Sequence, residues 1–403
     1  MTTQPTPRLS SRVAALQPSA TLAMIQRVRG LQSEGIPVLD LTAGEPDFPP
    51  PTAAEEAGIQ AIQEGKGRYT PAAGLMELRK AAADHIEKDF GLSYRPQEVV
   101  ITHGAKIGIA QALMAFGEVG RNVLVPYPCW TSYPEMVRLA EAEPVMVRCD
   151  SQQLPTVDEL EKSRDENTVA LLLNTPCNPT GVVFPEDRLR EIGQWALDHK
   201  IIVISDEIYG TLVYGDAEHI SPLSLIPELK ETSVWIGGMS KAYAMTGWRI
   251  GFVAAAEPLA KKIGAVQSQL AGSPCAISQW ASLAALQQGD QARETMRASF
   301  EIRRELLVQE LNQIPGLSCT MPQGAFYAFP NIQSYLGKTD PDSGRKVQTG
   351  DDLVEILLEQ DHIALIGGAA FGDPNSVRIS FAASADVLTE ALKRFRMRLS
   401  QLQ

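Results

Sequence analysis

The most informative stretch of the sequence is Gly237-Gly238-Met239-Ser240-Lys241-Ala242-Tyr243-Ala244-Met245-Thr246-Gly247-Trp248-Arg249-Ile250-Gly251. A run rich in β-branched and aromatic residues, 233–236, comes just before it, and a second strand-like run, 250–253, closes it. The pattern predicts two strands, with Lys241 beyond the end of the first and Arg249 just before the second. A lysine can condense with an aldehyde and an arginine can grip a phosphate, so the pair suits a ligand that carries both groups.

Length and composition set the outer limits. A chain of 403 residues is too long for one compact core, so we expect about two domains. The net charge of −12 argues against a nucleic-acid partner, which would need a basic face. No apolar run approaches the roughly 20 residues that span a bilayer, and the polar residues 1–7 carry no secretory signal. We therefore expect a cytoplasmic protein without a membrane partner.

The cysteines and histidines indicate no metal site. The cysteines are odd in number and lack C-x-x-C spacing, so we interpret them as reduced thiols of a cytosolic protein. The histidines are scattered and form no ligand pair. The residues are Cys129, Cys149, Cys177, Cys275 and Cys319, with His85, His103, His199, His219 and His362.

Short β-branched runs alternate with amphipathic segments over much of the chain. Several runs are continuously apolar, as expected for strands buried on both faces of a sheet. The alternation predicts an α/β domain with a mostly parallel sheet. The strand-like runs are 98–101, 122–125, 144–147, 168–173, 201–204, 233–236 and 250–253.

The pattern changes after Gly251. Two long helical stretches are predicted over 258–288 and 291–313, and a mixed region of short strands and helices follows from about 315 to 403. We divide the chain into an N-terminal arm with part of a smaller domain (1–45), a large domain (46–290) and a C-terminal smaller domain (291–403).

Chemically useful residues follow five of the predicted strands. Ligand sites in open α/β sheets form beyond the C-terminal ends of the strands, so these residues should meet. A glycine that opens a helix can cradle a phosphate on backbone N–H groups. Pyridoxal 5′-phosphate (PLP) would use such a cradle, an aromatic plate, a carboxylate and a lysine. The residues are Gly104, Trp130, Asn178, Asp206 with Tyr209, and Lys241.

Each of these residues also has a purely structural interpretation. Asp206 is a favoured helix cap, Asn178 before a proline is typical of loops, Trp130 could belong to the core, and Arg249 could form a surface ion pair. For the site to be absent, all of these structural interpretations would have to hold at the strand ends at the same time. Their joint probability is small, so the set favours a functional site. A nicotinamide-dependent dehydrogenase is a competing interpretation, but residues 65–67 lack the third glycine of its motif and follow a helical stretch; a Walker A loop is also absent.

The ordered motifs resemble the class I/II aminotransferases, which are fold-type I PLP enzymes, and most closely their bacterial-type aspartate aminotransferase branch. The resemblance runs from about Leu16 to Ala383. It implies a large domain with a mostly parallel seven-stranded sheet between helices, plus a smaller α/β domain. It rests on residues 18–21, 42–48, 69–74, 174–181, 205–209, 240–251 and 377–380.

The resemblance assigns roles around the cofactor. Lys241 is expected to link to its aldehyde and then to carry a proton, Asp206 to pair with the ring nitrogen, and Tyr209 to bond the 3-oxygen beside Asn178. Trp130 is expected to stack on the ring. The phosphate is expected to be held by Gly104, Ala105, Lys106, Ser240 and Arg249.

The resemblance also implies a homodimer with its active sites at the subunit interface. The equivalent of Tyr69 in the family reaches the phosphate of the neighbouring subunit, whereas an ordinary loop tyrosine is the alternative. The helical region after Pro258 would have an apolar face that needs a partner.

Substrate contacts follow from the same resemblance. Arg378 is expected to hold the α-carboxylate by a two-point fork, in a pocket that Gly44, Trp130 and Asn178 share. For a distal carboxylate, one related branch uses an arginine from the partner subunit, but residues 267–273 contain none.

The branch that this chain resembles uses hydroxyls and a lysine for the distal carboxylate, and Ser19, Thr21 and Lys106 stand at those positions. Ser19 could instead cap the following helix, and Lys106 could be a solvated lysine.

Two stretches depart from the family pattern, Gly238 and Gly367-Gly368, and Gln17 bears on the choice of substrate. Relatives often have Pro-Gly before the final strand, where this chain has Gly367-Gly368. Gly238 stands where many relatives have Ser or Thr, which leaves open whether Ser240 replaces that phosphate contact. Gln17 stands where relatives that accept prephenate have a basic residue.

We expect a ping-pong aminotransferase that uses aspartate and 2-oxoglutarate. The alternatives are an aromatic, kynurenine-like or prephenate aminotransferase, or a lyase or synthase of the same fold. A PLP-sensing transcription regulator would need a DNA-binding domain before the Gly44 motif, where only about 40 residues stand.

Overall fold

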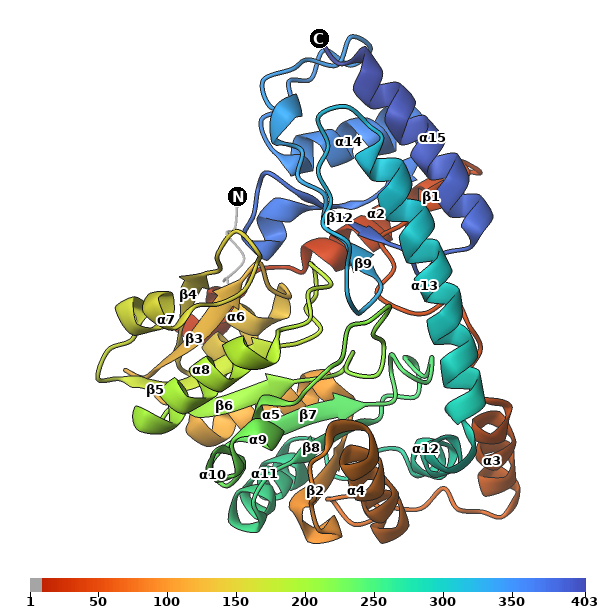
Figure 1. Ribbon diagram of the computed structural model, residues 1–403. Coiled ribbons are helices and arrows are strands. Elements are labelled where there is room, and N and C mark those ends of the chain that lie inside the picture. The colour runs from red at the N-terminus through yellow and green to blue at the C-terminus, as the bar shows by residue number, and fades with distance from the viewer. Residues whose placement is uncertain (1–8) are drawn as a thin grey trace, which may run out of the picture.

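The computed structural model describes residues 9–403, and its centre is a seven-stranded sheet (Figure 1). The strand order is β2-β8-β7-β6-β5-β3-β4, in which β8 alone is antiparallel to its neighbours. The predicted mostly parallel sheet is confirmed, and each predicted run corresponds to a strand. The strands are β2 (Val99–Thr102), β3 (Asn122–Tyr127), β4 (Glu143–Arg148), β5 (Thr168–Asn174), β6 (Ile202–Asp206), β7 (Val234–Gly238) and β8 (Gly251–Ala254).

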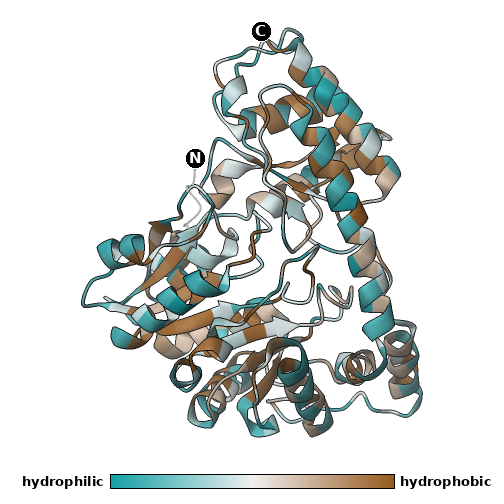
Figure 2. Cartoon of the chain, viewed as in Figure 1, coloured by the Kyte–Doolittle hydropathy of each residue, from teal (hydrophilic) through white to brown (hydrophobic). Residues whose placement is uncertain are grey.

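Helices cover both faces of this sheet, which is why its strands are continuously apolar. Leu171 and Leu173 of β5 pack into the core on one face, whereas Ala170 and Leu172 pack into the core on the other. Figure 2 shows apolar strands between helices whose outer sides carry polar residues. The first face is covered by α4 (Met76–Phe90), α8 (Glu186–Asp198) and α12 (Ala276–Gln288), and the second by α5 (Ala105–Phe116), α6 (Ser132–Leu139) and α11 (Glu257–Leu270).

The C-terminal region forms a second, smaller α/β layer. Its antiparallel sheet has the order β11 (Ile366–Gly367), β12 (Val377–Ser380) and β9 (Tyr327–Ala328), and it packs with α14 (Gly350–Asp361) and α15 (Ala385–Gln401). The short strand β1 (Leu39–Asp40) joins this region by pairing in parallel with β10 (Ile363–Ala364). The boundaries that we set at residues 45 and 290 stay a prediction.

The helical stretch predicted over 258–288 is wrong as a single element. It is two helices, because α11 ends at Leu270 and α12 begins at Ala276. Gly272, with φ +70°, and Pro274 lie between them and cannot continue a helix. The second predicted stretch is the single helix α13 (Asp290–Asn312), which runs from α12 up to α15 (Figure 1).

The remaining helices are short or peripheral. They are α1 (Ser11–Ala14), α2 (Ala20–Ser33), α3 (Thr52–Gln63), α7 (Val157–Ser163), α9 (Pro222–Leu225) and α10 (Pro227–Lys230). Within residues 9–403, no helix combines the length and the apolar character needed to cross a bilayer. The prediction for residues 1–7 lies outside the described residues.

Candidate active site

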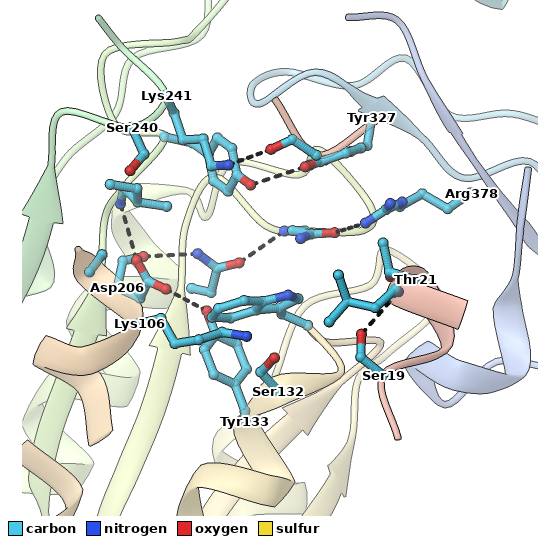
Figure 3. A pocket seen from close by; sticks show the side chains of 18 of the residues that line it. Ser19, Thr21, Lys106, Ser132, Tyr133, Asp206, Ser240, Lys241, Tyr327 and Arg378 are labelled. Carbon is cyan, nitrogen blue, oxygen red and sulfur yellow. Dashed lines mark hydrogen bonds between the residues drawn. The ribbon is translucent and has the colours of Figure 1, made fainter. Parts of the chain in front are cut away.

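A pocket of about 300 Å³ lies where the large sheet meets the C-terminal region. Side chains from beyond the C-terminal ends of β2, β3, β5, β6 and β7 line it, together with residues of α2, β9 and β12, and Figure 3 shows them facing one another. The lining residues are Ser19, Thr21, Leu22, Gly44, Ala105, Lys106, Trp130, Ser132, Tyr133, Asn174, Asn178, Asp206, Ile208, Tyr209, Ser240, Lys241, Arg249, Tyr327 and Arg378.

Lys241 lies three residues beyond β7 and reaches into this pocket. Its Nζ donates a hydrogen bond to the backbone carbonyl of Gly44. Burial, and then the nearby charge of Arg249, lower the pKa of Lys241 to about 8. A substantial fraction of the amine is therefore neutral near physiological pH, which is the form that attacks an aldehyde.

Asp206 is the last residue of β6 and is almost fully buried. Its Oδ2 accepts a 2.7 Å hydrogen bond from the hydroxyl of Tyr133, and its Oδ1 accepts one of 3.2 Å from the backbone N–H of Ile208. Burial raises the pKa of Asp206 to about 6, although the bond from Tyr133 opposes this shift. A buried carboxylate of this kind stabilises a cationic partner, such as a protonated ring nitrogen.

Arg378, on β12, brings a buried cation to the wall of the pocket that lies opposite Asp206 (Figure 3). Its Nη1 donates to Oδ1 of Asn178 at 3.1 Å, and its Nη2 donates to the backbone carbonyl of Thr42 at 2.9 Å. The ring of Tyr327 lies 4.4 Å from its Cζ, and the hydroxyls of Tyr327 and Tyr209 are 3.2 Å apart. Within the described part of the chain, Nε of Arg378 has no hydrogen-bond partner and no carboxylate pairs with the guanidinium. The site is therefore suited to an incoming carboxylate.

The N-terminus of α5 and Arg249 form an anion cradle. Gly104 is the N-cap of α5 and has φ +87°. A Cβ at this position would lie 2.4 Å from Nη2 of Arg249, so a side chain here would occupy the place of the guanidinium. Nη1 of Arg249 is fixed by a 2.7 Å hydrogen bond to the carbonyl of Thr246. Backbone N–H groups at a helix start and a guanidinium together suit a phosphate.

Close packing of the backbone explains why position 238 is a glycine. A Cβ there would lie 2.8 Å from Cα of Gly251 and 2.9 Å from the carbonyl oxygen of Ile250 on the neighbouring chain segment. A serine or threonine at this position would clash with this backbone. Ser240, which is buried, lines the pocket instead.

Ser19 and Thr21 line the pocket from the start of α2, and Lys106 lines it from the first turn of α5. Ser19 Oγ accepts a 3.3 Å hydrogen bond from the N–H of Leu22, so Ser19 caps α2 and also lines the pocket. Nζ of Lys106 lies 4.7 Å from the ring centroid of Trp130. Burial, followed by the charge of Arg249, lowers the pKa of Lys106.

Most of the residues predicted from sequence meet in this pocket. Gly104 supports it as the cap of α5 without lining it, and Tyr69 is fully exposed and lies outside the pocket of its own chain. Sequence reasoning missed Leu22, Ser132, Tyr133, Asn174, Ile208 and Tyr327. Asn174 ends β5 and Tyr133 follows Trp130 by three residues, so the strand end and the helical spacing were signals for those two.

The sequence model of aminotransferases of class I and II matches residues 36–395. The chain belongs to this aminotransferase family. An aspartate aminotransferase of Geobacillus stearothermophilus is 39% identical over 389 residues, which cover 96% of this chain and 98% of that protein. A bifunctional aspartate aminotransferase and glutamate/aspartate-prephenate aminotransferase of Petunia hybrida is 41% identical over 97% of this chain and 82% of its own length.

Solved aminotransferase structures share the whole fold. The crystal structure of the aspartate aminotransferase from Rhizobium meliloti superimposes with a TM-score of 0.94 at 37% identity, and the match covers 99% of this chain and 100% of that one. The expected fold class is confirmed. The aminotransferase family consists of PLP enzymes, so the chemistry of the pocket can be compared with that cofactor.

Proposed function

We propose that this aminotransferase binds PLP and transfers the amino group of aspartate to 2-oxoglutarate by a ping-pong reaction. The observation that carries the proposal is the charge of the pocket. Lys106, Lys241, Arg249 and Arg378 line it, and Asp206 is the single carboxylate among the residues of 9–403 that do so. An excess of cations in a partly buried space favours ligands with several negative groups. PLP with a dicarboxylic amino acid meets this requirement.

The side chains present fit PLP. Lys241 offers an amine with a lowered pKa for the aldehyde, and Asp206 offers a buried carboxylate for the ring nitrogen. Gly104 leaves room for the guanidinium of Arg249 beside the first turn of α5, where the phosphate would be held with Ser240. Tyr209 and Asn178 would contact the ring oxygen, and Trp130 the ring face.

The reaction then follows from what each residue can do. PLP would supply an electron sink for the carbanion at the substrate Cα. Lys241 Nζ would take up the Cα proton and return it, because its amine is neutral in part near pH 7. Asp206 would keep a proton on the ring nitrogen, and Arg378 would hold the α-carboxylate by two N–H groups.

A second carboxylate would be bound between Lys106 and the start of α2. Lys106 brings a cation from the first turn of α5, and Ser19 and Thr21 bring hydroxyls from the start of α2. Arg378 at one wall and Lys106 at the other would bind the two carboxylates of aspartate or glutamate. This arrangement favours dicarboxylates over aromatic donors, although the lysine is a point charge without the fixed fork of arginine.

A panel assay of the purified protein tests this function. We expect visible absorbance from bound PLP, the highest kcat/KM with aspartate and 2-oxoglutarate, and loss of turnover in Lys241→Ala. A higher kcat/KM with phenylalanine, kynurenine or prephenate would assign one of the alternative aminotransferases. Release of ammonia or of an elimination product would indicate a lyase.

We also propose a cytoplasmic homodimer whose active sites lie at the subunit interface. The support is Tyr69, whose side chain is fully exposed on the chain alone and could reach a second copy. Sedimentation of the wild type and of Tyr69→Phe, with PLP affinity measured for both, tests the idea. We expect a dimer in both and weaker PLP binding in the variant, whereas an active monomer would contradict the proposal.

A further inference from the structure

A second buried carboxylate follows Asp206 in the chain, and the proposed reaction does not use it. Successive side chains at a strand end point to opposite sides, so Glu207 is turned away from the pocket that Asp206 lines. The side chain of Glu207 has 0% exposed surface. A carboxylate is costly to bury unless several donors satisfy it, so the surroundings of Glu207 require an explanation.

Three donors hold the Glu207 carboxylate. The hydroxyls of Ser205 and Ser221 each donate to Oε1 at 2.7 Å, and Nε2 of His219 lies 2.8 Å from Oε2. Ser205 lies two residues earlier on β6 and faces the same side, and Ser221 caps the short helix α9. Both serines are completely buried. The carboxylate is therefore fixed from β6 and from the segment before α9.

The geometry also indicates the charge of this cluster. Nδ1 of His219 is buried, and among residues 9–403 no group lies within hydrogen-bond distance of it. A protonated imidazole needs acceptors at both nitrogens, so the arrangement favours a neutral ring that donates from Nε2. Three donors face the oxygens of Glu207, an arrangement that suits an acceptor-only carboxylate anion. Glu207 therefore carries a negative charge that His219 does not cancel.

We propose that Glu207 is a positioning residue that acts through Asp206. The buried charge of Glu207 strengthens the attraction of this strand end for a protonated ring nitrogen. Glu207 is not among the residues that line the pocket, so it would act on a ligand there through Asp206. Burial is the largest cause of the raised pKa of Asp206, and the charge of Glu207 adds to it in the same direction. The inference rests on the proposed use of PLP.

The test measures how tightly the cofactor-free protein binds PLP and an analogue that has C–H in place of the ring nitrogen. Glu207→Gln keeps the shape and the acceptor for the serines, and removes the charge. We expect PLP affinity to fall about tenfold, which is roughly 1.4 kcal/mol, and the affinity for the analogue to stay within about threefold. The ¹⁵N resonance of labelled PLP should also move toward its unprotonated position at a lower pH than in the wild type.

His219→Gln is the matched control, because it keeps a donor near Oε2 and leaves the charge of Glu207 in place. We expect its ratio of PLP affinity to analogue affinity to equal that of the wild type. An equal loss of both affinities in Glu207→Gln, or no loss of either, would overturn the inference. If Glu207→Gln does not fold, Glu207→Asp decides: it keeps the charge, so a reduced ratio would overturn the inference and an unchanged ratio supports it.

The proposed function fails separately. A wild type that binds neither PLP nor the analogue would refute the use of PLP itself. If the wild type binds PLP and the Glu207→Gln variant has the wild-type ratio of PLP affinity to analogue affinity, only the role of Glu207 is refuted.

Discussion

The hydroxyl of Tyr133 donates a 2.7 Å hydrogen bond to Oδ2 of Asp206, and both side chains are buried. This bond comes from α6 and holds the carboxylate that the ring nitrogen would meet. It also stabilises the ionised form of Asp206 against the effect of burial.

Tyr133→Phe should therefore weaken catalysis without unfolding the protein. A hydrogen bond to a charged group contributes about 1.5–3 kcal/mol, so we expect kcat/KM to fall by about ten- to a hundredfold. Tyr335→Phe is the control, because that buried hydroxyl bonds the carbonyl of Pro315 away from the pocket. Equal losses in the two variants would assign Tyr133 a general packing role.

Asp206→Asn should stabilise the cofactor-free protein at neutral pH while abolishing efficient turnover. The pKa of Asp206 is raised to about 6, so the folded state holds its proton more tightly than the unfolded state does. Ionising Asp206 therefore costs the folded state free energy that the unfolded state does not lose. This cost is absent below the unfolded pKa near 4, grows between pH 4 and pH 6, and is constant at higher pH. We expect a gain of about 3 kcal/mol at pH 8 that shrinks toward pH 4, measured by urea unfolding. A gain independent of pH would contradict this.

The reaction of the cofactor-free protein with PLP should depend on the titration of Lys241. Its pKa is lowered to about 8, and the neutral amine is the nucleophile, so the rate should rise with pH around a midpoint near 8. Stopped-flow absorbance measures this rate, with Lys241→Ala as the blank. A midpoint close to that of an ordinary lysine would show that the pocket leaves the amine unperturbed.

Lys106→Met should lower kcat/KM for dicarboxylic substrates. The methionine keeps the aliphatic stem beside Trp130 and removes the charge, so packing and electrostatics are separated. Because the amine is partly exposed, we expect a loss of about tenfold in kcat/KM for aspartate and little change for phenylalanine. An equal loss for both donors would place Lys106 in cofactor binding.

Gly104→Ala should weaken cofactor binding. The residue has φ +87°, and its Cβ would lie 2.4 Å from Nη2 of Arg249. Backbone strain of about 1–2 kcal/mol and displacement of the arginine should increase the PLP dissociation constant by about tenfold or more. Gly30→Ala in α2 is the control, since nothing lies within 4 Å of that Cβ. Equilibrium dialysis measures the PLP dissociation constant of both variants, and we expect it to increase only in Gly104→Ala.

The part of the site that sequence could predict is the part that follows buried strands. Parallel strands covered on both faces are continuous apolar runs; Asp206 ends one of them, and Asn178 and Lys241 follow two others by a few residues. Tyr327 could not be predicted in this way, because β9 has two residues and its position depends on pairing with β12. The break between α11 and α12 was visible in Gly272 and Pro274, but the amphipathic pattern on both sides obscured it.

The pocket takes its lining from Ser19 at one extreme of the sequence and from Arg378 at the other, and Leu39 pairs with Ile363 to hold these parts together. On the ribosome, the large sheet can be complete in the nascent chain while β10 and β12 are still inside the exit tunnel. The amine of Lys241 is then present without the arginine that would receive an α-carboxylate. Arg378 is therefore the last residue of the pocket lining to leave the ribosome, and the pocket is completed only when the C-terminal region folds.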